Sequence, residues 1–313
     1  MNILVTGGAG YIGSMVCRRL IHEGNAVTAY DSLLFGGKGL LGLWDVPSFH
    51  FIHGDIRDAD KMHKACRNKD VVIHLAALVG ELQCMQDAQE TENVNFTATW
   101  RLVNQVKAQG GKFVFASTCS NYGISEHEEL MDEDSILKPL SLYADTKIRA
   151  ENEILKIADD NFKPLILRFA TAYGLSPRMR FDLLLNEFVR DAIMNKYVLV
   201  YGASSWRPFV HVYDIARFIK RCLDRNASGV FNVGGDNLRK SDIVTRLQRL
   251  QPELSVDIKE GKKDPRNYRV DFTRARREGF IPMESPDNGI ESIAAALRTG
   301  VFVDPHSKEY RNA

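Results

Sequence analysis

Two short motifs hold residue types that suit redox chemistry on a bound dinucleotide. The first reads T-G-G-A-G-Y-I-G over 6–13, directly after an apolar run. Glycines there let the backbone turn tightly and approach a pyrophosphate, whose charge then lies against a helix N-terminus. The second reads Y-A-D-T-K over 143–147. A tyrosine and a lysine four positions apart on a helix project from one face, and this pair suits proton transfer beside a nicotinamide ring.

The second motif supplies a candidate base. A phenol has an ordinary pKa of about 10, which is too high for a base at neutral pH. The ammonium group of Lys147 and a positive nicotinamide both favour the phenolate of Tyr143, so we expect the pKa of this phenol to be lowered. Thr118 ends a predicted strand and is placed to hydrogen-bond the reacting oxygen. Tyr143, Lys147 and Thr118 are therefore the predicted catalytic residues.

The cofactor is predicted to be NAD. The glycines of the first motif are Gly7, Gly10 and Gly13. Asp31 ends the second predicted strand, where an acidic side chain accepts hydrogen bonds from the adenosine ribose and repels a 2′-phosphate. NAD is therefore favoured over NADP. Asp55 and Ile56 follow the third predicted strand and are expected near the adenine edge.

A parallel sheet is expected to position these motifs. Strands are predicted at 2–6, 26–31, 49–53, 71–75, 113–117 and 165–169, and helices at 11–23, 59–67, 86–108 and 141–158. Buried strands that alternate with helices form a parallel sheet covered on both faces, and right-handed crossovers make it doubly wound. Ligands of such sheets bind at the carboxyl ends of the strands.

The pattern changes after residue 173. Helices are predicted at 181–196 and 213–224, with strands at 198–201 and 230–233. The predicted fold class is α/β, a doubly wound parallel Rossmann sheet with a smaller mixed α/β C-terminal lobe. The NAD-binding domain is predicted to comprise 1–172 plus about 209–235, and the substrate lobe 173–208 and 236–313.

Composition disfavours several other functions. The chain has 313 residues, 44% hydrophobic and 26% charged, with a net charge of +1. That balance argues against nucleic acid or an acidic membrane as the main partner. No apolar stretch reaches the roughly 20 residues that span a bilayer, and the N-terminus enters a predicted strand at once, which leaves no room for a signal peptide. Five scattered cysteines without metal-ligand spacing are typical of reduced thiols in the cytoplasm, so no metal is expected.

The chain resembles the extended short-chain dehydrogenase/reductase family, the NAD-dependent nucleotide-sugar epimerases and dehydratases. The matching motifs follow the family's order from residue 2 to at least residue 234. They are GGAGYIG at 7–13, HLAA at 74–77, NVN at 93–95, YADTK at 143–147, RPFVHVYD at 207–214 and FNVG at 231–234.

The resemblance implies a role for each matching residue. Tyr143 would be the base, Lys147 would hold the nicotinamide ribose and tune Tyr143, and Thr118 would bind the sugar oxygen. Arg207 would clamp the nucleotide diphosphate, because a guanidinium suits phosphate oxygens. Asn93 would support the active-site helix. The residues implied to wall the cofactor are Tyr11, Ile12, Leu75, Ala76 and Ala77.

The resemblance also implies the substrate and the assembly. The expected partner is a nucleotide-diphosphate sugar. Family members usually dimerise through the helices predicted here at 86–108 and 141–158, so a homodimer is expected. Further candidate substrate ligands are Thr171, Arg178, Arg180, Asn186 and Arg266.

The residues after Thr118 bear on the reaction. Family members remove a hydride from sugar C4 while the tyrosine takes the hydroxyl proton. The 4,6-dehydratases carry an Asp-Glu pair directly after the threonine, where this chain has Cys119 and Ser120. Dehydration is therefore disfavoured. Cys119 is also a candidate for the further acid/base of a 3,5-epimerase, although a small buried residue is the simpler interpretation.

Two reactions stay open. In 4-epimerisation the keto sugar turns over and takes the hydride back, whereas a net 4-dehydrogenase releases it. Thr171 stands where many 4-epimerases have Asn, and segments 78–84 and 176–183 resemble a subgroup that includes a nucleotide-heptose 4-dehydrogenase. We expect a 4-epimerase first and the dehydrogenase second. A non-catalytic nucleotide sensor is disfavoured by the intact tyrosine–lysine pair, and a reductase of a non-sugar carbonyl by Arg207.

Overall fold

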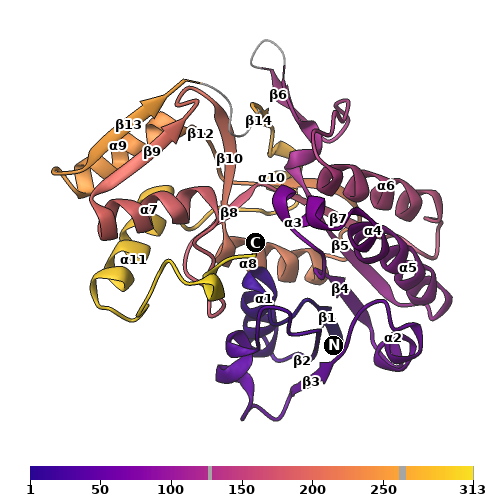
Figure 1. The fold of residues 1–313 in the computed structure, drawn as a ribbon. Helices are drawn as coiled ribbons and strands as arrows, with labels where there is room; N and C mark the ends of the chain where they lie inside the picture. The colour runs from indigo at the N-terminus through magenta and orange to yellow at the C-terminus, as the bar shows by residue number, and fades with distance from the viewer. Residues whose placement is uncertain (126–128, 261–265, 313) are drawn as a thin grey trace.

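A seven-stranded parallel sheet forms the centre of the molecule (Figure 1). The structure, a computed structural model, describes residues 1–125, 129–260 and 266–312. The strands are, in the order in which they lie, β11 (Gly229–Val233), β7 (Leu165–Phe169), β5 (Lys112–Thr118), β4 (Val71–His74), β1 (Asn2–Thr6), β2 (Ala26–Asp31) and β3 (Phe49–His53). Every neighbouring pair is parallel, which confirms the predicted fold class.

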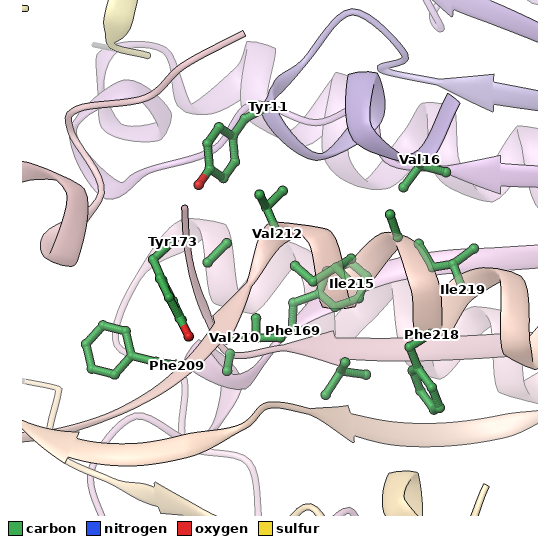
Figure 2. Packing of buried hydrophobic residues seen from close by; sticks show 14 of the residues in the cluster. Tyr11, Val16, Phe169, Tyr173, Phe209, Val210, Val212, Ile215, Phe218 and Ile219 are labelled. Carbon is green, nitrogen blue, oxygen red and sulfur yellow. The ribbon is translucent and has the colours of Figure 1, made fainter. Parts of the chain in front are cut away.

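Helices cover one face of this sheet through the larger hydrophobic core. α1 (Tyr11–His22) and α8 (Val212–Asp224) pack against each other on this face. Figure 2 shows Val16 of α1 facing Ile215 and Ile219 of α8, and all three side chains are fully buried. α8 begins directly after a strand of the second half of the chain that ends at His211. This connection places α8 beside α1.

The other face is covered by a second core. It is formed by α2 (Ala59–Cys66), α5 (Ala98–Ala108) and α6 (Leu142–Lys156). Along β1, Leu4 belongs to this core, whereas Ile3 and Val5, on either side of it in sequence, belong to the first core. Successive side chains of a strand point to opposite faces, so a strand buried on both faces must be a continuous apolar run.

The helix predicted over 86–108 is present from residue 88, and a π-helical turn lies within it. The structure divides this region into α3 (Glu81–Gln86), α4 (Ala88–Glu92), a π-helical turn (Asn93–Thr97) and α5. The side chain of Asp87 accepts a hydrogen bond from the N–H of Glu90 and so begins α4 anew. The π turn inserts a wider turn before α5.

The remaining elements form small sheets and helices beside the main sheet. Their bounds are β6 (Leu130–Met131), β8 (Thr171–Tyr173), α7 (Leu184–Asn195), β9 (Tyr197–Tyr201), β10 (Trp206–His211), β12 (Asp236–Arg239), α9 (Lys240–Leu250), β13 (Ser255–Lys259), β14 (Arg269–Val270), α10 (Thr273–Arg277) and α11 (Pro286–Arg298). The predicted strand over 198–201 is confirmed as β9, but the helix predicted from 181 begins at Leu184. Figure 1 shows α7, α9, α11, β9 and β13 gathered on one side of the molecule.

Candidate active site

One cavity of about 1040 Å³ lies at the carboxyl ends of the sheet strands and extends to α7 and β9. The predicted site residues in its lining are Gly7, Gly10, Tyr11, Ile12, Gly13, Asp31, Asp55, Ile56, Leu75, Ala76, Ala77, Thr118, Tyr143, Lys147, Thr171, Arg178, Arg180, Arg207 and Arg266. Asn93 and Asn186 are not among the lining residues. The fold thus brings the predicted cofactor and catalytic residues into one space.

The glycine motif leaves room for a ligand where β1 meets α1. Gly7 has a φ of +70°, which side chains rarely adopt. A Cβ atom on Gly13 would clash with the carbonyl oxygen of Gly7, so α1 can begin this close to the loop only with glycine there. Tyr11 and Ile12, at the start of α1, line the cavity. A helix N-terminus attracts anions, so this end fits a dinucleotide pyrophosphate.

Asp31 presents an oriented carboxylate to the same cavity. The N–H of Ala9 donates to its Oδ2 (3.0 Å), and the N–H of Leu33 donates to its Oδ1 (2.8 Å). Burial raises the pKa of Asp31, while these two hydrogen bonds lower it. The remaining lone pairs can accept ribose hydroxyls. Asp55 also lines the cavity, and its hydrogen bond from Arg57 lowers its pKa.

Helix α6 positions the tyrosine–lysine pair. Ser141 caps the helix by accepting a hydrogen bond from the N–H of Ala144 (3.2 Å). Lys147 is 2% exposed, and its Nζ donates to the carbonyl oxygen of Ala116 (2.9 Å). The same Nζ lies 6.0 Å from the centroid of the Tyr143 ring. Burial lowers the pKa of Lys147 to about 8, so the side chain is charged at neutral pH.

Burial and nearby positive charges have opposite effects on the pKa of the Tyr143 phenol. Burial raises its pKa, and the charges of Arg180 and Arg266 lower it by smaller amounts. The protein's own groups therefore do not produce the lowered pKa expected from the sequence, an expectation that also included the charge of nicotinamide. Because both arginines line the cavity, they add positive charge on the side of the phenol that faces the ligand.

Comparison with known proteins identifies the family. A sequence model of the NAD dependent epimerase/dehydratase family matches residues 3–234. The chain belongs to this family. NAD is its cofactor, and the glycine motif and Asp31 have the geometry to hold the pyrophosphate and the ribose.

Similar proteins within the family catalyse different reactions. A dTDP-glucose 4,6-dehydratase of Streptomyces griseus is 32% identical over 311 residues, covering 94% of this chain and 93% of that protein. A UDP-N-acetyl-alpha-D-glucosaminuronate decarboxylase of Bacillus cytotoxicus is 28% identical over 296 residues, covering 91% and 88%. The solved UDP-glucuronic acid 4-epimerase of Bacillus cereus, in complex with UDP-glucuronic acid and NAD, has a TM-score of 0.86 at 26% identity and covers 96% of this chain and 99% of its own.

Cys119 and Ser120 occupy different environments at the end of β5. Cys119 is fully buried, its thiol donates to the carbonyl oxygen of Arg168 (3.2 Å), and burial raises its pKa. These features fit a small packed residue rather than an acid/base. Ser120 lines the cavity and accepts a hydrogen bond from Nη1 of Arg266 (3.0 Å). Neither position supplies the carboxylate expected of a dehydratase.

Asn95, and not Asn93, supports the active-site helix. The side chain of Asn93 accepts a hydrogen bond from Gln89 at the surface (3.2 Å). Asn95 is fully buried, accepts from the N–H of Leu78 (2.8 Å) and donates to its carbonyl oxygen (2.9 Å). It also donates to Thr146 of α6 (3.5 Å). The two asparagines face different sides because residues two positions apart on a helix do not share a face.

Asn186, which the sequence predicted as a substrate ligand, is not among the residues that line the cavity. Its side chain is fully buried. Oδ1 accepts from the N–H of Gly174 (3.0 Å), while Nδ2 donates to the hydroxyl of Tyr11 (3.2 Å) and the carbonyl oxygen of Arg180 (2.9 Å). Asn186 therefore positions two residues that do line the cavity.

A buried ion pair behind the catalytic residues was not anticipated from the sequence. Arg168 of β7 donates to both carboxylate oxygens of Glu151 on α6, through Nε (3.2 and 3.1 Å) and Nη2 (2.7 Å). Ser117 and Asn121 donate to the same carboxylate. The network ties α6 to β5 and β7, and so fixes Tyr143 relative to the end of the sheet.

Arginines from the second half of the chain line the opposite side of the cavity. Arg207 is 2% exposed, and its Nη1 donates to the carbonyl oxygens of Trp206 and Arg266. Asp264 and Pro265, the two residues before Arg266, lie outside the described residues. The convergence of these cations suits a ligand that carries phosphate charge.

The described part of the chain offers neither a metal centre nor a membrane-spanning helix. Within 1–125, 129–260 and 266–312, no group of three or more His, Cys, Asp or Glu side chains is arranged to hold a metal ion. In the same part of the chain, every helix falls short of the length and apolarity needed to cross a membrane. The five cysteines are buried free thiols.

Proposed function

We propose that the protein is a nucleotide-sugar 4-epimerase that works by transient oxidation at C4. The observation that carries this proposal is the composition of the cavity around the base. Thr118, Tyr143 and Lys147 line it together, while the positions after Thr118 hold a buried thiol and the hydroxyl of Ser120. Such a site can move the C4 proton and hydride but has no carboxylate there for eliminating a C6 group.

Each catalytic residue has one task in this proposal. Tyr143 accepts the proton of the C4 hydroxyl, and Thr118 hydrogen-bonds the same oxygen. Lys147 holds the nicotinamide ribose and stabilises the developing phenolate with its charge. NAD, when bound, accepts the C4 hydride and returns it. The keto sugar must then turn within the cavity before it is reduced on its other face.

The substrate half of the cavity supports a nucleotide-diphosphate sugar. Arg207 and Arg266 are assigned to the diphosphate, because a guanidinium group can donate two parallel hydrogen bonds to phosphate oxygens. Thr171 is assigned to the sugar. We also propose a homodimer formed through α5 and α6, whose outer faces leave Trp100 of α5 and Leu155 of α6 exposed.

A net 4-dehydrogenase is the second candidate. The segments over 78–84 and 176–183, which resemble a nucleotide-heptose 4-dehydrogenase, both contribute to the cavity lining. Leu78 and Leu82 come from the first segment, and Arg178 and Arg180 from the second. The two reactions share the first half of the chemistry and differ in whether the keto sugar leaves.

A panel of nucleotide sugars tests the proposal. The purified protein is mixed with NAD and with UDP-, GDP-, dTDP-, ADP- and CDP-sugars in turn, and products are identified by NMR. We expect one nucleotide class to yield the C4 epimer without lasting absorbance at 340 nm. A 4-keto-6-deoxy product would indicate a dehydratase, and unchanged sugars across the panel would contradict the proposed substrate class.

A further inference from the structure

The segment after α11 returns to the cofactor cavity, and the proposed reaction makes no use of it. In Figure 1 the yellow end of the chain runs from α11 to the centre of the molecule, beside α1. Its residue Asn312 lines the cavity. We call residues 308–312 the C-terminal strap.

On one side, the strap is bound to the residues that follow β8. Nη2 of Arg178 donates to the carbonyl oxygen of Arg311 (2.9 Å), and the N–H of Asn312 donates to Oδ2 of Asp182 (3.0 Å). Asp182 in turn accepts two hydrogen bonds from Arg180 (2.9 and 2.7 Å). Arg178 and Arg180 are 5% and 9% exposed and line the cavity. The strap therefore helps to orient two buried guanidinium groups there.

The two arginines lie along different parts of the dinucleotide cavity. The guanidinium carbon of Arg178 lies 4.7 Å from the centroid of the Phe35 ring. The charge of Arg178 also acts on the carboxylate of Asp31, whose pKa burial raises, and lowers that pKa by a smaller amount. The charge of Arg180 instead acts on Tyr143. Asp31 marks the adenosine end and Tyr143 the nicotinamide end. One guanidinium group therefore acts toward each end of the span that a pyrophosphate would bridge.

On its other side, the strap reaches the first half of the chain. Nζ of Lys38 forms an ion pair with Oε2 of Glu309 (2.7 Å). The side-chain nitrogen of Gln83, in the orientation that satisfies its neighbours, donates to the carbonyl oxygens of Asn312 (2.9 Å) and Val79 (3.2 Å). The strap thus connects both walls of the cavity.

The strap is anchored by one aromatic residue. The ring centroid of Tyr310 lies 5.6 Å from that of Phe181 and 5.4 Å from that of Phe302. The N–H of Phe181 also donates to the carbonyl oxygen of Tyr310 (2.9 Å). The Lys38–Glu309 pair is exposed, and exposed ion pairs contribute little. The ring contacts of Tyr310 and the hydrogen bonds of Arg311 and Asn312 are therefore the main attachments of the strap.

We propose that the C-terminal strap gates the exchange of NAD. When attached, it closes the outer side of the cavity and holds Arg178 and Arg180 against the pyrophosphate. When detached, it frees both arginines and opens the way out. The proposal depends on NAD binding and not on which sugar reaction follows. Slow release would keep the nicotinamide in place between removal and return of a hydride.

The release rate of a fluorescent NAD analogue tests the gate. The protein is loaded with etheno-NAD and mixed with excess NAD in a stopped-flow instrument. Asn312→Pro removes the backbone N–H that donates a hydrogen bond to Asp182, whereas Asn312→Ala keeps this N–H. We expect Asn312→Pro to release the analogue about tenfold faster, as befits one lost hydrogen bond to a charged group. Asn312→Ala should stay close to the parent rate.

A second pair of variants tests the anchor. Tyr310→Ala should also accelerate release, and Tyr310→Phe, which keeps the ring contacts, should restore slow release. Circular dichroism establishes that each variant is folded at the assay temperature. If Tyr310→Ala is unfolded, the release rates of the two Asn312 variants test the gate by themselves. Equal rates for parent, Asn312→Pro and Asn312→Ala would overturn the proposal. The assay contains no sugar, so this outcome is distinct from failure of the epimerase proposal.

Discussion

Tyr143→Phe is expected to lower kcat by about 10²–10⁴-fold, the usual contribution of a positioned acid/base, while NAD affinity stays close to that of the parent. Phenylalanine occupies the same space on α6 but cannot take up the proton of the sugar hydroxyl. Steady-state kinetics with the responding nucleotide sugar measures the first effect, and titration with NAD measures the second.

A second tyrosine of the cavity provides the control for this variant. Tyr201 of β9 lines the same cavity and has no part in the proposed proton transfer. Tyr201→Phe should therefore change KM more than kcat. The assignment of the base is wrong if Tyr143→Phe turns over at a nearly normal rate, or if the two variants lose kcat equally.

Arg168→Met is expected to lower the free energy of unfolding by about 3–5 kcal/mol, as is typical when one partner of a buried ion pair is removed. The side chains of Arg168 and Glu151 are 6% and 1% exposed. Methionine would leave the Glu151 carboxylate buried without its cation, and it would also remove the donors to Tyr122 and to the carbonyl oxygen of Glu133. Urea unfolding followed by circular dichroism measures the loss.

An exposed ion pair on α6, the helix that carries Glu151, provides the matched control. Arg149 of α6 pairs with Glu92, and the two side chains are 39% and 29% exposed. Water already screens this pair, so Arg149→Met should cost only about 0–1 kcal/mol. Equal losses for the two variants would mean that burial of the Arg168 pair does not determine its contribution.

The parts of the account that sequence could predict are those governed by local pattern. Apolar runs predicted the strands, because strands buried on both faces must be apolar throughout. The glycine motif and Asp31 were predictable since they flank strands whose carboxyl ends meet at one edge. Tyr143 and Lys147 were predictable because their spacing alone puts them on one helix face.

The parts that the sequence did not reveal depend on contacts between distant segments. The N-V-N motif contains two asparagines, and the motif alone does not show that Asn95 is the buried one that contacts α6. Asn186 stands among cavity residues in sequence, yet its amide is taken up by Tyr11 and its own loop. Nothing in the local pattern pairs Arg168 with Glu151, because one is on a strand and the other on a helix.

The most direct test of the central claim follows the C4 hydrogen itself. The responding nucleotide sugar is prepared with deuterium at C4 and incubated with the protein and unlabelled NAD. The account predicts that the epimeric product keeps deuterium at C4, with no lasting absorbance at 340 nm, because the hydride returns to the sugar from which it came. Deuterium found in released NADH, together with a 4-keto sugar, would contradict it.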